Sequence, residues 1–332
     1  MKQLHHLLIV VLALLFSSVL LSVPFTEQTD AADFPEKGRT ISIIIGFAPG
    51  SNTDVGARLM AAPLEKEMGV PVQVINKPGA GTQVAMTYLA NAKPDGYTIG
   101  YNPFVSLTTA YLDPQRQATF TAKSFETLAM HIVDPNGFAV AANSPFKNMK
   151  DIVEAARAKP QTIKMSDFGV GGGGHLASLE LQRITNTKFN LVHFNGGAPA
   201  IMAMLGGHVD CYSGSVGAMV PQVRSGQLRV LGVVDKVESK FLPGIKTLEA
   251  QGIPLFVTSG RGFIMPAGGN REIVNKLVNV IGKVMQSEEH KKAIWDTGQE
   301  VRYMDPAQTK AYWMDVENQL KPMMEIMAKE TK

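Results

Sequence analysis

One arrangement recurs along this chain: a short apolar segment, a glycine-rich turn and a segment with helical spacing. It first appears in "IIIGFAPGSNTD", where strand-type residues run into glycines and a proline before a helical pattern begins. Strands are expected at 41–46, at 71–76 and after "KPDG", and helices at 54–68 and 84–91. Short strands that are apolar on both faces and alternate with helices are typical of a buried parallel sheet, so the sequence predicts an α/β fold.

The arrangement restarts in the middle of the chain and then gives way to a different C-terminal pattern. The middle part predicts a helix at 151–158 and then four strands, at 162–168, 190–194, 209–213 and 228–234. Helices at 175–185 and 199–205 and a third helix between the last two strands separate them. The C-terminal part predicts a strand at 262–266, an amphipathic helix over 271–286 and a last helix rich in methionine.

This order predicts two lobes, the second inserted into the first. Lobe 1 is expected to comprise 33–130 and 240–332, and lobe 2 to comprise 131–239. The chain would cross between the lobes at 125–142 and again at 228–262. Two such crossings are typical of binding proteins that close about a hinge.

The N-terminal segment, residues 1–32, is set apart from the predicted fold. Met1–His6 is weakly basic, and Leu7–Val23 is an apolar run broken only by serines and followed by small residues. This pattern predicts a secretory signal peptide, cleaved between Ser22 and Ala32, and hence a periplasmic protein. An uncleaved membrane anchor is the alternative, because the run is close to the length of a membrane span.

The net charge argues against a nucleic-acid-binding protein, and the cysteine count excludes an internal disulfide. The formal net charge is only +3 and the basic residues are scattered, so we expect no nucleic-acid partner. Cys211 is the single cysteine, which excludes an internal disulfide, and its place on a predicted strand favours the core over a nucleophilic role. We expect a monomer.

Glycine-rich loops follow four of the predicted strands, at 47–54, 76–82, 169–175 and 195–199. Ligands of open α/β sheets bind at the carboxyl ends of the strands, where such loops lie. Three of these loops open onto a helix N-terminus, and the unpaired N–H groups and helix dipole there favour an anion.

Nucleotide and hydrolase motifs are incomplete. "GVGGGG" at 169–174 fits G-x-G-x-x-G, but "FNLVHFN" at 189–195 lacks the acid that a dinucleotide site needs for the ribose. No P-loop occurs, and "SGSVG" at 213–217 has serine where a nucleophile elbow has its first glycine. We therefore expect neither a cofactor nor a nucleophilic serine.

The histidines of the second lobe are candidate metal ligands. His175, His193 and His208 fall near predicted loop ends with Asp210 nearby, but no compact ligand spacing supports a metal site. Asp54 is the only acid of the first loop, and two roles stay open for it. It caps the helix together with Ser51, or it meets an ammonium or hydroxyl group of the ligand.

Read together, these stretches resemble the extracytoplasmic solute receptors of tripartite tricarboxylate transporters, often called Bug receptors. The resemblance rests on "FAPGSNTDVGAR", "PVQVINKPGAGTQVA", "AKPDGYTIG", "GVGGGGHLASLELQ", "HFNGGAPAIMAMLGGHVD" and "LPGIKTLEAQGIP", in this order over nearly the whole mature chain. It implies a type II periplasmic-binding-protein fold, with two Rossmann-like lobes, a ligand cleft and a hinge. It also implies a non-catalytic receptor that delivers a small carboxylated solute to membrane transporter subunits.

The resemblance implies that backbone groups and bridging waters of loops 47–54 and 169–175 bind the carboxylate, with the turn at Ala48–Asn52 beneath it. No Arg or Lys lies inside these loops or inside 195–199, and N–H donors and bridging waters can hold a carboxylate without an ion pair. The residues predicted to bind the ligand are Phe47, Ala48, Pro49, Gly50, Ser51, Asn52, Asp54, Gly79, Gly171, Gly172, Gly173, His175, Asn195, Gly196, Gly197 and Asp210.

The chain departs from the family pattern at several places. Ser51 replaces a glycine, Lys77 replaces an arginine, and Arg261 replaces an aromatic residue. The stretch "DPQRQATFTAKSF" at 113–125 is altered as well. These departures leave open which acid binds: a mono-, di- or tricarboxylate, an amino acid or an aromatic acid.

Two other functions remain as alternatives. On the same fold, the loaded protein would act as a sensor that docks on a signalling protein. In a different class, a secreted hydrolase or lyase would use His175 and Asp54 as base and acid.

Overall fold

The computed structural model describes residues 34–255 and 258–330, so the predicted signal peptide lies outside the described residues. Their strands form a ten-stranded sheet in the order β2-β1-β3-β9-β4-β7-β5-β6, and β10 and β8 also pair with β4. Within these described ranges, none of the helices combines the length and the apolar character needed to cross a bilayer.

The first half of the sheet contains the three parallel strands predicted from the N-terminal units. Its strands are β1 (Ile41–Ile45), β2 (Val72–Asn76), β3 (Thr98–Pro103), β9 (Thr258–Pro266) and β10 (Val301–Met304). β1 pairs in parallel with both β2 and β3, whereas β9 runs antiparallel to β3. β1 and β3 are buried, but β2 is only partly buried because it forms the edge of the sheet. The expectation of burial on both faces therefore fails for β2.

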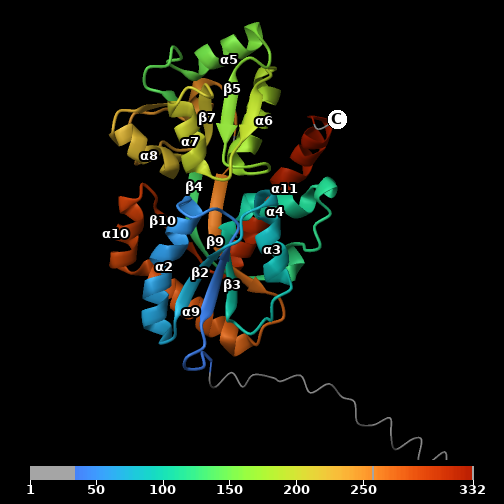
Figure 1. The fold of residues 1–332 in the computed structure, drawn as a ribbon, viewed down its shortest axis with the longest axis vertical. Helices are drawn as coiled ribbons and strands as arrows, with labels where there is room; N and C mark the ends of the chain where they lie inside the picture. Colours follow the sequence, from blue (N-terminus) through green and yellow to red (C-terminus); the bar gives the residue numbers. More distant parts are fainter. Residues whose placement is uncertain (1–33, 256–257, 331–332) are drawn as a thin grey trace, which may run out of the picture. The chain divides into compact units, whose positions relative to one another are not determined.

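The helices of this half cover the strands on both sides (Figure 1). They are α2 (Asn52–Met68), α3 (Gln83–Ala90), α4 (Phe104–Leu112), α9 (Arg271–Gln286) and α10 (Glu288–Asp296), with 3-10 turns η2 (Ala80–Thr82), η3 (Pro114–Arg116) and η4 (Ala122–Ser124). Their buried side chains, such as Met86 and Phe104, form a core cluster with Ile44 of β1 and Ile264 of β9.

Strand β4 (Phe125–Ala141) joins the two halves of the sheet. Its first part, residues 125–135, pairs with β9, and its last part, residues 136–141, pairs with β8. The predicted crossing at 125–142 is thus one long strand that belongs to both halves.

The second half follows the order predicted from the middle of the chain. Its strands are β5 (Lys164–Asp167), β6 (Asn190–His193), β7 (Cys211–Ser215) and β8 (Leu228–Val234), and its helices are α5 (Met149–Ala158), α6 (Gly173–Thr185), α7 (Gly197–Leu205) and α8 (Val216–Arg224), followed by η5 (Glu249–Gln251). β5 pairs in parallel with β6 and β7. Cys211 is fully buried in this half, as its place on a strand predicted.

The last helix, α11 (Pro306–Glu330), contributes to the cores of both halves. Trp313 packs in the cluster of the first half, beside Phe104. Val316 and Leu320 belong to the cluster that contains Phe138 of β4 and residues of α5 and α6. The last helix predicted from the sequence therefore packs in the cores of both halves.

Candidate ligand-binding cleft

Two adjacent cavities lie between the loops of the first and second halves of the sheet. They share Phe47 and Phe168 in their linings. The smaller cavity, of about 40 Å³, is also lined by Ser51, Asn52, Thr53, Gly196, Gly197, Ser215, Ala218 and Arg261. The larger cavity, of about 350 Å³, is also lined by Gly46, Pro78, Gly79, Ala80, Gly81, Arg116, Gly169, Val170, His193, Phe194 and Asn195.

Three helices begin at the smaller cavity. Ser51 is the N-cap of α2, Gly196 is the N-cap of α7, and Ser215 is the N-cap of α8, and each lines this cavity. The first N–H groups of a helix lack partners inside the helix, and the helix dipole places partial positive charge there. The smaller cavity is therefore suited to an anion.

The loop before α2 is shaped by glycine and by the cap of the helix. Gly46 packs so closely against η2 that a Cβ atom there would lie 2.7 Å from the Thr82 Cβ. Gly50 adopts φ +80°, a conformation that favours glycine. The Asp54 N–H donates to the Ser51 Oγ at 3.2 Å, which fixes the start of α2 at the cavity.

The carboxylate of Asp54 is used within the chain. It accepts hydrogen bonds from the Gly50 N–H at 2.9 Å, the Arg58 Nε at 3.0 Å and the Asn76 Nδ2 at 2.9 Å. Burial acts to raise the pKa of Asp54, but hydrogen bonds from these groups outweigh it and lower that pKa. Asp54 lines neither cavity, so its contacts favour the structural role over the ligand-binding role.

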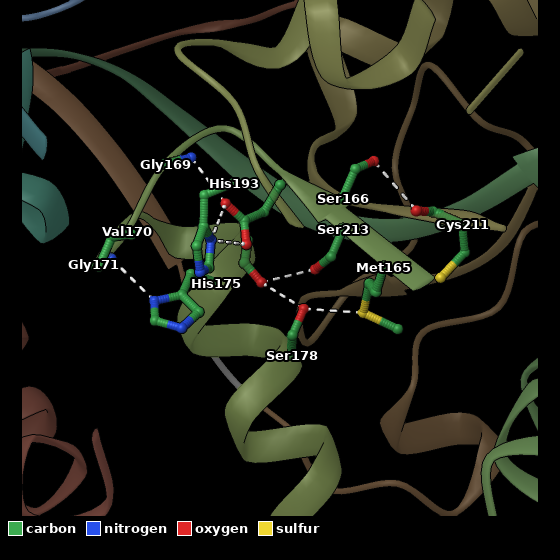
Figure 2. Close-up of polar contacts among 12 residues, drawn as sticks. Met165, Ser166, Gly169, Val170, Gly171, His175, Ser178, His193, Cys211 and Ser213 are labelled. Atoms are coloured by element: carbon green, nitrogen blue, oxygen red, sulfur yellow. Dashed lines mark hydrogen bonds and ion pairs between the residues drawn. The ribbon is translucent and has the colours of Figure 1, made fainter. Parts of the chain in front are cut away.

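Two side chains accept hydrogen bonds from the backbone of the loop before α6 and fix its shape (Figure 2). The Gly171 N–H donates to His175 Nδ1 at 2.9 Å, and the Gly169 N–H donates to Asp167 at 2.8 Å. His193 Nδ1 bonds the same carboxylate at 2.8 Å. Burial lowers the pKa of His175 to about 3, so its ring is neutral and accepts at Nδ1.

The histidines weighed as metal ligands are only partly brought together. The rings of His175 and His193 lie 4.6 Å apart, centroid to centroid. His208 is exposed, and Asp210 accepts from the Lys164 N–H at the amino-terminal end of β5, away from the loop that ends this strand. Among the described residues, no group of three or more potential metal ligands occurs.

The glycines that open α6 are required by packing. A Cβ atom on Gly173 would lie 2.6 Å from Asn136 Nδ2, and one on Gly174 would lie 2.1 Å from the carbonyl oxygen of Ser213. Gly171 adopts φ +74°, which favours glycine. Close approach of α6 to β4 and β7 therefore explains much of the "GVGGGG" sequence without a nucleotide.

The cavities contain seven of the residues predicted from the sequence. Phe47, Ser51, Asn52, Gly196 and Gly197 line the smaller cavity, and Gly79 and Asn195 line the larger one. The others lie in the same loops without lining either cavity, or, for the last of them, at the opposite end of the strands: Ala48, Pro49, Gly50, Asp54, Gly171, Gly172, Gly173, His175 and Asp210.

Sequence reasoning missed two arginines at the cleft because neither belongs to the loops considered. Arg116 donates to the carbonyl oxygens of Ala80 at 3.1 Å and Val170 at 2.9 Å, so it connects the loops on the two sides of the larger cavity. Arg261 reaches the smaller cavity from β9. The three loops themselves contain no Arg or Lys, and these two side chains reach the cavities from other parts of the chain.

Arg261 belongs to a buried polar network. Its Nη2 donates to Asp134 Oδ2 at 2.7 Å and also to Gln299 Oε1. The same carboxylate accepts from the Ser215 hydroxyl and, at 3.1 Å, from the Gly217 N–H. Asn52 Nδ2 donates to Ser215 Oγ at 2.9 Å. This network connects the starts of α2 and α8 to β4 and β9.

Known proteins are similar to this chain in sequence and in fold. BugT of Bordetella pertussis is 27% identical over 314 residues, which cover 93% of each chain. MatC of Rhodopseudomonas palustris with bound malate has a TM-score of 0.80 at 23% identity, over 88% of this chain and 100% of MatC. The protein Rpa4515 of R. palustris with adipate also has a TM-score of 0.80, at 22% identity, over 89% of this chain and 98% of Rpa4515.

The two structural neighbours have the two-lobed fold of periplasmic binding proteins, as the sequence predicted. Residues 56–328 match the family described as "Tripartite tricarboxylate transporter family receptor", which is most of the chain. This chain belongs to the family of tripartite tricarboxylate transporter receptors.

Proposed function

We propose that the protein is a periplasmic receptor that captures a small carboxylated solute in its cleft and delivers it to a tripartite tricarboxylate transporter. The observation that carries this proposal is the smaller cavity, at which three helix N-termini meet. Family membership supports the transporter partner, and the fold neighbours with malate and adipate support the ligand class.

The binding energy needed for this role is within reach of the cleft. A helix N-terminus contributes about 0.3–2 kcal/mol to an anion, and a charge-assisted hydrogen bond about 1.5–3 kcal/mol before ordering costs. Micromolar affinity needs about −8 kcal/mol. A few N–H donors from α2, α7 and α8 are therefore sufficient, with bridging waters where direct contact is too long.

We further propose that the two lobes follow the order predicted from the sequence, 33–130 with 240–332 and 131–239, except that 240–255 belongs to lobe 2, because Leu242 and Leu248 pack in the cores of the second half, and that the lobes close about β4 and β9. These strands pair with each other and also connect the two halves of the sheet. Asn52 and Ser215, and Arg116 and Val170, form hydrogen bonds across the cleft, as expected of a closed form. The predicted site residues that lie in the cleft loops without lining a cavity are proposed to shape these loops, whereas Asp210 lies at the opposite end of the strands and is left out of the proposed site.

Isothermal titration calorimetry of the refolded mature chain tests whether the protein binds a carboxylated solute without converting it. The panel contains succinate, malate, adipate, citrate, benzoate and L-aspartate, and refolding from denaturant removes any acid that copurifies. We expect at least one acid to bind with a micromolar dissociation constant and to be recovered unchanged after prolonged incubation. Binding of none of them, or chemical conversion of the one that binds, would contradict the proposal.

A further inference from the structure

Arg261 and Asp134 form an ion pair that is almost fully removed from water. Their exposed fractions are 4% and 5%, and both side chains meet at the border between the two halves of the sheet. Because an unpaired buried charge is costly, each residue requires the other.

The two members of the ion pair differ in the hydrogen-bonding groups that remain without a partner. Both carboxylate oxygens of Asp134 accept hydrogen bonds, Oδ2 from Arg261 and Ser215 and Oδ1 from Gly217, and Asp134 lines neither cavity. Arg261 is not saturated: in the part of the chain that the structure describes, its Nε is buried and has no hydrogen-bond partner. Arg261 also lines the smaller cavity. Of the two residues, only Arg261 both lines the smaller cavity and keeps a donor without a partner.

We propose that Arg261 is the residue that sets the charge of the ligand group accepted in the smaller cavity. It pairs with the carboxylate of Asp134, which would otherwise attract a ligand ammonium group, and its Nε donates to an anionic oxygen of the ligand. This inference rests on the proposed receptor function and narrows the ligand to plain or hydroxylated carboxylic acids, with amino acids rejected.

The charge balance around the cavity agrees with this assignment. Three helix N-termini each place about half a positive charge at the cavity wall. The ion pair adds no net charge, so one ligand carboxylate is balanced without a further cation. Without Arg261, the carboxylate of Asp134 would oppose an anion and offer an acceptor to an ammonium.

The size of the cavity explains why a single group is selected there. A volume of about 40 Å³ holds a few water molecules or one carboxylate, whereas the adjacent cavity of about 350 Å³ has room for the body of a small acid. Phe47 and Phe168 border both cavities and provide apolar contact between them.

Succinate and L-aspartate are matched probes, because they differ only by the ammonium group. Calorimetry on the refolded wild type and on Arg261→Met measures both dissociation constants. We expect the wild type to prefer succinate, and Arg261→Met to lose at least about 30-fold of its succinate affinity, as when the partner of a buried charge is removed. The ratio of aspartate to succinate affinity should rise at least tenfold, because Asp134 becomes available.

Three further variants separate ligand selection from a structural role. Arg261→Lys keeps the charge and should keep the preference for succinate. Arg261→Met combined with Asp134→Asn should recover part of the succinate affinity, because the opposing carboxylate is gone. Arg183→Met removes an exposed arginine that pairs with Glu180 and should leave both dissociation constants unchanged.

The possible outcomes distinguish this inference from the proposed function. Equal losses of succinate and aspartate affinity in Arg261→Met would show that Arg261 only supports the structure and would overturn the inference. A wild type that binds aspartate as tightly as succinate would overturn it as well, while the receptor function stands. Absence of binding by any acid of the panel would overturn both.

Discussion

A pair of buried histidines should make the protein lose stability in mild acid. His131 of β4 and His290 of α10 are almost fully buried, and their Nε2 atoms lie 2.8 Å apart. His131 Nδ1 in turn bonds the Tyr101 hydroxyl at 2.8 Å. The Nε2–Nε2 hydrogen bond holds one proton. Protonation of the acceptor ring would set a second N–H against the first, and protonation of the donor ring would place a charge on a buried ring at its other nitrogen.

The magnitude follows from the pKa of His290, which burial lowers to about 4. In the unfolded chain a histidine has a pKa of about 6.5, so between about pH 6.5 and pH 4 the unfolded state binds a proton that the folded state does not. The free energy of unfolding is therefore highest above pH 6.5 and falls as the pH drops through this window. At pH 5 the loss is about 2 kcal/mol for His290, from about 1.5 pH units at 1.36 kcal/mol each. Burial also lowers the pKa of His131 well below its usual value, which adds a loss of the same sign.

Urea unfolding followed by circular dichroism at pH 8 and pH 5 measures this loss. In His290→Gln, the difference between the two pH values should shrink by about 2 kcal/mol, although the variant is less stable at pH 8. His208→Gln is the matched control, because His208 is exposed and should leave the difference unchanged. An equal difference in the wild type and in His290→Gln would refute the reasoning.

Three further outcomes test other parts of the structure. Gly174→Ala should lower the free energy of unfolding by about 1–3 kcal/mol in urea titrations, because its Cβ would lie 2.1 Å from the Ser213 carbonyl oxygen; unchanged stability would show that α6 packs less closely. Asp54→Asn should lower stability by about 1–2 kcal/mol and change the succinate dissociation constant less than about threefold, because Asp54 bonds Arg58 and lines neither cavity; a large loss of affinity would mean that it contacts the ligand. Small-angle X-ray scattering should show a smaller radius of gyration at saturation with the tightest-binding acid, and an unchanged radius would argue against lobe closure.

Local sequence signals predicted most of the strands and helices. The α2 and α9 helices carry caps and an apolar face that are visible in the sequence, and β8 was predicted over its observed residues. The α4 helix was missed because "FVSLTTAYL" is rich in β-branched and aromatic residues and is buried on nearly all sides. A helix of this kind shows no amphipathic pattern.

The site was predictable only where its residues are local to a loop. Ser51, Asn52 and Gly197 line the smaller cavity. They were predictable because the start of a helix is signalled by the residues immediately around it. Arg116 and Arg261 were not predictable in this way. Arg116 reaches Val170 across 54 positions of the chain, and Arg261 reaches Asp134 across 127, so the contacts exist only once the tertiary structure is known.

For Arg261, knowledge of one strand pairing would have been enough. In the register of β4 and β9, Ile132 pairs with Arg261 and Asp134 pairs with Ser259. Side chains two residues apart along a strand point to the same face, so Asp134 lies diagonally opposite Arg261 and within reach of its long side chain. Arg261 thus places a cation beside an acid that lies where the two halves of the sheet meet. In the arrangement that we propose, a ligand bound in the smaller cavity meets the ion pair and not the acid alone, so Arg261 would bear on which solute the receptor accepts.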